Sequence, residues 1–443
     1  MPAVLKASRL RRILAAYTVN RLGTWFGLIA LSLAVFDHTH SALAVAGLLV
    51  AGQVLPAFVV PALVARVEAS RRGRELSGLY TFEAVVTVAL AVLLWHFSLP
   101  AVLLLVALDG TAALAASALL RTETARAARD ELAGEDPADG DEPAEERAQD
   151  AERRANAALN VAFSVTFVLG PALAGAIVAA GGAPLALFVD AASFLICGAV
   201  LLDLHPHVED AAGESVRSRL RAAWRHINEV PALRALLITQ AVAMVFFESA
   251  APIEVAYAKV TLAAGDSGFG FLVGTWGAGV VLGSIVFARS SSRPLGVMLT
   301  AGTLAVGAGY VGFAAAPSLL AACPAALVGG IGNGIQWAPM ISAVQRLTPQ
   351  ALLGRVMSAV ESMGALCPAV GLLLGGALVA LSSPRVAFTV VGVGAMLTTL
   401  AFMRIHVDQA ATATGAGKDV GQAEAVADPE LPARTGTIEP APH

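Results

Sequence analysis

Long apolar runs dominate this chain. About twelve of them reach membrane-spanning length, and short polar turns separate them. The first run, 13–36, would measure roughly 36 Å as a helix, enough to cross a hydrocarbon layer of ~30 Å with some tilt. Hydrophobic residues make up 57% of the chain and charged residues only 14%, more apolar surface than a water-soluble domain can bury. The sequence therefore predicts an all-α integral membrane protein.

The apolar runs also predict a domain organisation. The expected spans are 13–36, 41–64, 76–97, 100–120, 156–180, 183–203, 233–257, 268–288, 296–316, 318–344, 356–381 and 385–403. A link over 204–232, with the basic stretch SVRSRLRAAWRHI, divides them six and six and is expected to lie on the membrane surface as an amphipathic helix. We therefore predict one bundle over 1–203, a second over 233–403, and a disordered polar tail over 404–443.

Basic residues fall almost entirely in alternate turns. They precede the first span and follow the second, fourth, sixth, eighth and tenth, whereas the opposite turns hold Lys259 and Arg385. Because cytoplasmic turns retain Lys and Arg, both termini are predicted to be cytoplasmic in a multi-pass plasma-membrane protein. The acidic loop 121–154 would share that side, and a solvated insertion is favoured there over a regulatory docking segment.

Several classes of protein are disfavoured. Cys197, Cys323 and Cys367 stand singly in apolar runs without metal-ligand spacing. The stretch GIGNG at 330–334 lacks the lysine of a phosphate-binding loop. No nucleophile, base and orienting group recur at useful spacing, so we expect no enzyme. We likewise expect no cofactor, no metal and no nucleic-acid partner.

Four segments carry a family resemblance. They are PALVARVEASRRGREL at 61–76, GPALAG at 170–175, FVDAASF at 188–194 and LTPQALLGRVMSAVESM at 347–363. Together they resemble the major facilitator superfamily, in particular its enterobactin-exporter-like efflux branch. The resemblance implies twelve transmembrane helices in two six-helix bundles.

Two of these segments also imply roles for particular residues. In the first, Arg66, Arg71 and Arg72 match the basic positions of the family's gating loop, although Pro61 and Ala65 replace its usual glycine and aspartate. In the second, Gly170 and Gly175 allow two helices to approach closely and Pro171 permits a bend.

Ionisable residues inside the spans are costly, so each is a functional hypothesis. The set comprises Arg21, Glu83, Asp109, Asp190, Glu248, Glu254 and Glu361. The resemblance implies that spans one, four, seven and ten line a central cavity, which favours Arg21, Asp109 and Glu248 as proton-coupling residues. Glu83 and Glu361 are further coupling candidates, and Asp190 is interpreted as architectural. For Asp109 and Glu248, proton coupling and a structural ion pair with Arg21 both stay open.

Uncharged polar residues mark the expected substrate surface. Tyr17, Asn20 and Thr24 share a helical stripe with Arg21. On span ten, Asn333, Gln336 and Trp337 would supply amides and an indole. Such a wall suits a polar-aromatic organic molecule better than a simple ion.

The resulting hypothesis is a monomeric secondary active transporter that exports a small organic molecule, such as a siderophore, drug or natural product, in exchange for protons. Proton-coupled uptake, lipid flipping on the same fold and a non-transporting membrane sensor or assembly partner are the alternatives.

Overall fold

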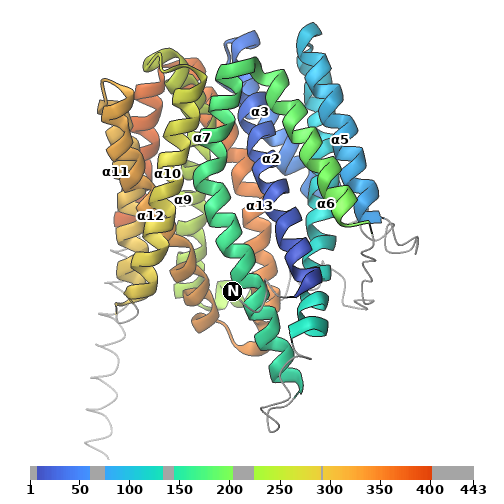
Figure 1. Cartoon of the computed structure of the whole chain (residues 1–443). Helices are drawn as coiled ribbons and strands as arrows, with labels where there is room; N and C mark the ends of the chain where they lie inside the picture. The colour runs from blue at the N-terminus through green and yellow to red at the C-terminus, as the bar shows by residue number, and fades with distance from the viewer. Residues whose placement is uncertain (1–6, 60–74, 133–143, 203–223, 291–292, 402–443) are drawn as a thin grey trace, which may run out of the picture. The chain divides into compact units, whose positions relative to one another are not determined.

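The computed structural model describes residues 7–59, 75–132, 144–202, 224–290 and 293–401, and every regular element in these ranges is a helix (Figure 1). The α-helices are α2 (Ser8–Thr39), α3 (Ala42–Leu49), α5 (Glu75–Leu93), α6 (Leu99–Leu132), α7 (Ala144–Val200), α9 (Pro231–Ala256), α10 (Gly265–Arg289), α11 (Leu295–Ala315), α12 (Leu319–Leu347) and α13 (Gln350–Leu381). Three short segments interrupt or extend them, namely η1 (Val50–Val54), η2 (Leu94–His96) and η3 (Tyr257–Thr261). A last helix covers Pro384–Ala401.

Long apolar helices make up most of the described chain. Eleven of its helices are long and apolar enough to span a bilayer. One of them, Arg147–Val200, has 54 residues and would measure roughly 80 Å if straight. Instead, Gly182 adopts φ 76° and ψ 171°, and α7 turns back on itself there (Figure 1). Counting the two arms of α7 separately gives twelve candidate spans, and the predicted fold class is confirmed.

The helix ends define two faces. We call the end where α2 begins the Arg9 face and the end where α2 stops the His40 face. At the latter, His40 takes a left-handed conformation with φ 50°, and its N–H donates to the Phe36 carbonyl at 2.7 Å. The next helix starts at once because the Ser41 hydroxyl accepts a hydrogen bond from Ala44 N at 3.2 Å. The turn at Gly182 and the turn between η3 and α10 lie at the same face.

Two helices extend beyond their predicted spans at the Arg9 face. The expected ends were 120 and 156, whereas α6 continues to Leu132 and α7 begins at Ala144. Both ends of the acidic loop 121–154 are therefore helical, and residues 133–143 lie outside the described part, so the solvated insertion stays a prediction. Glu123 is buried and pairs with Arg9 at 2.6 Å. The carboxylate of Glu131 accepts hydrogen bonds from Arg9 N at 2.9 Å and Leu10 N at 3.1 Å, and so caps the first turn of α2.

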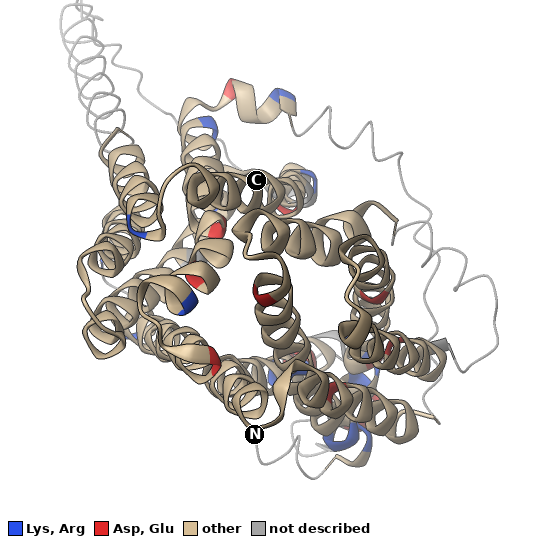
Figure 2. Ribbon diagram, turned by 90° about the horizontal axis from the view of Figure 1, so that it is seen from above, with Lys and Arg blue, Asp and Glu red and all other residues tan. Residues whose placement is uncertain are grey.

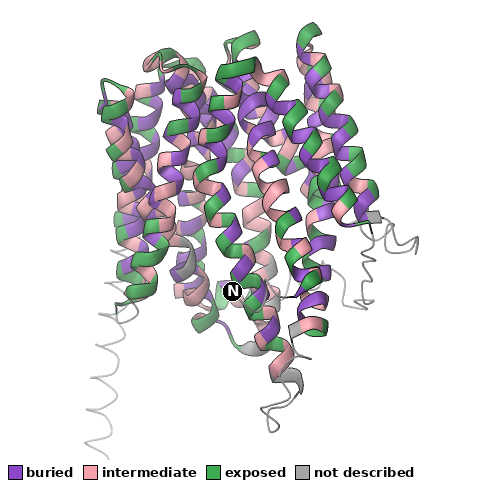
Figure 3. Cartoon of the chain, in the orientation of Figure 1, coloured by how far each residue is buried: buried purple, intermediate pink, exposed green. Residues whose placement is uncertain are grey.

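Buried apolar side chains show how the halves of the chain meet. We call the helices up to Val200 the N-terminal bundle and those from Pro231 the C-terminal bundle. One buried cluster, which includes Ile13 and Tyr80, draws only on residues of the N-terminal bundle. Another joins the two bundles, packing α2 and α3 against Val255, Phe269 and Leu372. Buried, intermediate and exposed residues alternate along the helices (Figure 3).

The inter-bundle cluster lies in the half of the molecule nearer the His40 face. Its members include Phe36, Ala42 and Phe269, which flank the turns of that face. The helix pairs α7 with α10 and α3 with α13 are in contact across the bundles. Most of the ribbon is uncharged when it is seen down the helix axes, and charged residues occupy scattered positions, some of them side by side (Figure 2).

Some predictions fall outside the described residues. They concern Arg66, Arg71 and Arg72, the tail over 404–443 and most of the link 204–232, of which 224–229 is helical. The division into bundles over 1–203 and 233–403 stays a prediction.

Candidate functional site

Two adjoining cavities open inside the N-terminal bundle. The first, of about 360 Å³, is lined by Asp109 and Asp190, and the second, of about 330 Å³, by Tyr17 and Asn20. Arg21, Thr24 and Gln53 line both. The predicted polar stripe of α2 thus faces these two cavities. The Thr24 hydroxyl donates to the Asn20 carbonyl at 2.9 Å, which keeps that hydroxyl against its own helix.

The N-terminal bundle holds three carboxylates of interest, and two of them, Asp109 and Asp190, line the larger cavity. Glu83 on α5 is fully buried, and neither of its oxygens has a hydrogen-bond partner among the described residues. Thr87 Oγ1 donates to Asp109 Oδ1 at 3.5 Å, a long contact. Asp190 on α7 is 4% exposed and accepts from Ser193 Oγ at 3.4 Å. None of the three carboxylates forms an ion pair within the described part of the chain.

The sequence explains why Asp190 fits so closely against α2. Gly23 and Gly27 lie one helical turn apart on α2 and face this carboxylate. A Cβ on Gly23 would lie 2.4 Å from Asp190 Oδ1, and a Cβ on Gly27 would lie 2.5 Å from Oδ2. The two glycines therefore create the space that the carboxylate fills. Asp190, interpreted from sequence as architectural, also lines the larger cavity.

Arg21 is not the partner of these carboxylates. Its guanidinium carbon lies 5.1 Å from the centroid of the Phe163 ring, a cation–π contact. Its Nε is buried and has no hydrogen-bond partner among the described residues. No ion pair joins Arg21 to Asp109 or Glu248 in the described structure, so of the two open alternatives the ion pair has no geometric support.

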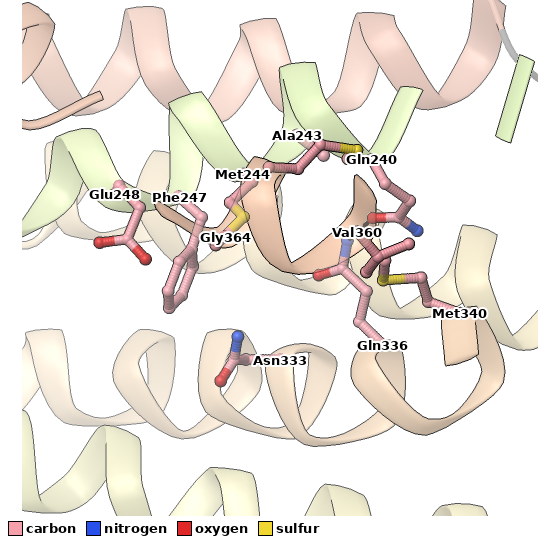
Figure 4. Close-up of a pocket in the computed structure, with 11 residues that line it drawn as sticks. Gln240, Ala243, Met244, Phe247, Glu248, Asn333, Gln336, Met340, Val360 and Gly364 are labelled. Atoms are coloured by element: carbon pink, nitrogen blue, oxygen red, sulfur yellow. Dashed lines mark hydrogen bonds between the residues drawn. The ribbon is translucent and has the colours of Figure 1, made fainter. Parts of the chain in front are cut away.

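A third cavity, of about 160 Å³, lies inside the C-terminal bundle (Figure 4). Gln240, Phe247 and Glu248 line it from α9, while Asn333 and Gln336 face them from α12. The remaining wall contains methionine side chains, those of Met244, Met340 and Met363. Methionine adapts its shape readily, so this wall can accommodate ligands of irregular shape.

Hydrogen bonds fix one side of the C-terminal cavity and leave the other free. Gln336 Nε2 donates to Gln240 Oε1 and to Thr303 Oγ1, both at 3.1 Å. The Asn333 amide and the Glu248 carboxylate have no side-chain hydrogen bond to any residue that the structure describes. These two groups are the ones available to a ligand. The sequence had singled out both.

The other predicted site residues lie elsewhere. Glu361 is exposed on α13, and neither it nor Glu83 lines any of the three cavities. Trp337 is on α12, but its side chain lies outside the described part. A Cβ on Gly170 would lie 2.4 Å from the Trp25 ring, and one on Gly175 would lie 3.0 Å from Gly270 Cα, so both glycines permit close packing.

Sequence reasoning missed three residues. Gln53 and Gln240 line cavities, and Thr303 accepts a hydrogen bond from Gln336. They are uncharged polar residues in apolar spans, which is a weaker signal than a charge. Gln53 lies in the π-helical segment η1, and such segments are frequent at functional sites. Within the described residues, no group of three His, Cys, Asp or Glu side chains could hold a metal ion.

Residues 236–431 match the family model described as Major Facilitator Superfamily. Solved structures extend the likeness over most of the chain. The nucleoside transporter NupG superposes with a TM-score of 0.68 at 13% identity, covering 90% of this chain and 99% of that one. This chain has the major facilitator fold.

Two further structures agree with this fold. The POT family transporter PepTSo gives a TM-score of 0.62 at 10% identity, covering 91% of this chain and 98% of that one. A bacterial homologue of the iron transporter ferroportin, in an inward-facing state, gives 0.62 at 16% identity, with coverages of 89% and 98%. No curated protein matches the sequence. The names of these structures refer to different kinds of transporter, so the shared fold does not identify a substrate.

Proposed function

We propose that this chain is a secondary active transporter that exports a small organic molecule across the plasma membrane in exchange for protons. One observation supports this most: carboxylates that form no ion pair within the described residues line cavities in both bundles of an otherwise apolar body. Ionisable groups inside a membrane are expensive, so they are rare outside functional sites.

Asp109 and Glu248 are the proposed coupling residues. Each lines a cavity, one in each bundle. A carboxylate without a fixed cation is able to take up a proton when its cavity faces one side and release it on the other. Arg21 contacts the Phe163 ring rather than either carboxylate, which leaves both carboxylates able to take up a proton.

The cavity walls favour an organic substrate. The C-terminal cavity combines a free amide, a carboxylate, a phenyl ring and methionine side chains. Pockets of that kind bind molecules with both polar groups and apolar surface. A siderophore, a drug or another natural product fits this chemistry, as the resemblance to efflux proteins implies.

Alternating access supplies the proposed mechanism. The two bundles pack together in the half nearer the His40 face, while the cavity lined by Tyr17, Ser117 and Leu120 extends toward the Arg9 face. We assign the Arg9 face to the cytoplasm on the basis of its basic turns. Rocking of the two bundles would then expose the cavities outside, with Arg66, Arg71 and Arg72 as proposed gating residues.

Accumulation in energised cells tests this proposal. Cells producing the protein should accumulate less of a transported dye or labelled siderophore than cells with an empty vector, and a protonophore should abolish the difference. The Asp150→Asn variant, altered outside the three cavities at a side chain that is 50% exposed, is the matched control and should behave like the original protein. Protein-dependent accumulation that collapses with the proton gradient would establish uptake instead, and no effect across a compound panel would favour a sensor.

A further inference from the structure

Lys259 joins the two bundles at the His40 face. Its Nζ lies 2.8 Å from Asp37 Oδ1 and 2.5 Å from Asp266 Oδ1. Asp37 belongs to α2 of the N-terminal bundle, whereas Asp266 and Lys259 belong to the C-terminal bundle. The Lys259 side chain is 17% exposed, so the ammonium is largely shielded from water. Only the contact with Asp37 would break if the bundles separated.

The local backbone holds Lys259 in place. It lies in the π-helical segment η3, where Leu262 N donates to the Tyr257 carbonyl at 2.9 Å. The Tyr257 hydroxyl donates to the Phe313 carbonyl at 2.6 Å, which anchors the start of the segment. The following turn requires φ 47° at Ala263 and φ 67° at Gly265, and it brings Asp266 back toward the ammonium. A strained turn and a π-helix together build this position.

The two carboxylates that contact Lys259 lie at opposite ends of helix dipoles. Asp266 lies in the first turn of α10, where a carboxylate is favourable. Asp37 lies in the last turn of α2, where the partial negative charge of the helix end opposes it. The ammonium of Lys259 compensates that repulsion. Arg385, the other basic residue of the sequence's opposite turns, donates to the Ala314 carbonyl at 2.7 Å and so stays within its own bundle.

Two helix crossings surround this contact at backbone distance. A Cβ on Gly270 of α10 would lie 2.9 Å from Gly175 Cα on α7. A Cβ on Gly376 of α13 would lie 2.8 Å from Leu43 Cα on α3. All four helices must part when the His40 face opens. The ion pair between Lys259 and Asp37 therefore lies at an interface between the bundles whose two glycine crossings carry no charge.

We infer that Lys259 is the latch of the His40 face: Asp266 positions its ammonium, and its pairing with Asp37 across the bundles favours the closed state. This inference rests on the proposed alternating access. Separating the bundles removes the cation from Asp37 and returns both groups to water. Loss of the pair should therefore raise the open population without changing either bundle's own packing.

Distances between spin labels test the latch in the purified full chain in nanodiscs. One label pair, His40→Cys with Leu320→Cys, reports on the His40 face, and a second, Arg153→Cys with Ala288→Cys, reports on the Arg9 face; all four sites are exposed. The native cysteines Cys197, Cys323 and Cys367 are replaced. An exposed or partly exposed ion pair shifts a two-state equilibrium by roughly two- to fivefold. Lys259→Gln and Asp37→Asn should each raise the long-distance fraction at the His40 face by that factor and shorten the distance at the Arg9 face.

Arg385→Gln is the matched control, because it removes one positive charge from the same face and no contact between bundles. It should leave both distributions unchanged. The Asp37 side chain is 47% exposed, so its variant tests the latch even if Lys259→Gln fails to fold. Unchanged distributions in Asp37→Asn, or an equal shift in Arg385→Gln, would overturn the latch. The distance measurement needs neither a substrate nor an assigned orientation. A negative transport assay therefore does not decide its outcome.

Discussion

Asp109 and Glu248 share an environment although they belong to different bundles. Each lines a cavity, and neither has an ion-pair partner among the described residues. Removing the charge from a paired carboxylate would strand a buried cation at a cost of about 3–5 kcal/mol. No such cation stands beside either residue, so their neutralisation should spare the fold and affect only proton coupling.

Asp109→Asn and Glu248→Gln test this expectation in reconstituted vesicles with an imposed pH gradient. If either residue carries the coupling proton, its amide variant should still bind and exchange substrate but fail to concentrate it. The free energy of unfolding, measured by thermal denaturation, should stay within about 1 kcal/mol of that of the original protein, because no ion pair is lost. Two variants that retain full gradient-driven transport would remove both residues from the mechanism.

At this scale the sequence predicts the charged positions better than their contacts. A charge in an apolar span is visible without a structure, and Asp109 and Glu248 do line cavities. The place of Asp190 at the cavity is harder to predict, because it depends on Gly23 and Gly27 of another helix. The contact partner of Arg21 is equally hard to predict, since a long side chain can reach a carboxylate or an aromatic ring from the same backbone position.

Among the elements, α7 and α10 show how glycine sets the distance between bundles. A Cβ on Gly270 would lie 2.3 Å from the Pro171 carbonyl oxygen, closer than any real contact. Gly296 at the start of α11 offers the opposite case, because no atom of the described residues lies within 4 Å of its Cβ position. The pair permits a matched comparison of the same substitution.

We expect Gly270→Ala to lower the free energy of unfolding by about 1–3 kcal/mol, because α7 and α10 must move apart. Gly296→Ala should leave it unchanged or raise it by up to ~1 kcal/mol through helix propensity. Thermal unfolding of both variants in detergent measures the difference. Equal stability of the two variants would show that the Gly175 crossing tolerates a methyl group.

The helix boundaries show where hydropathy stops being informative. Apolar runs predict the membrane-embedded parts of α6 and α7, but both helices continue into polar sequence. The stretches RTETARAARDEL and AEERAQDAERRA contain strong helix formers, and contacts such as Arg9 with Glu123 stabilise them. Those contacts join residues far apart in the chain, so no local pattern reveals them.

For the molecule as a whole, alternation of the basic turns predicts which face meets the cytoplasm. On a cysteine-free background, an impermeant thiol reagent added to intact cells should label His40→Cys and spare Ala288→Cys. Both side chains are exposed, so access to the reagent and not burial decides the result. Labelling of position 288 alone would invert the assignment, and permeabilised cells, in which both positions should react, provide the control.

The carboxylate of Glu131 has a consequence for how this protein is made. It supplies acceptors for the first N–H groups of α2, yet it follows Leu10 by 121 residues. At about 5–20 residues per second, a ribosome needs roughly 6–24 s to reach it. During that interval the amino end of the first helix stays uncapped while three further spans are synthesised. Only when the fourth span carries its polar extension out of the bilayer does the start of the chain acquire its native partner.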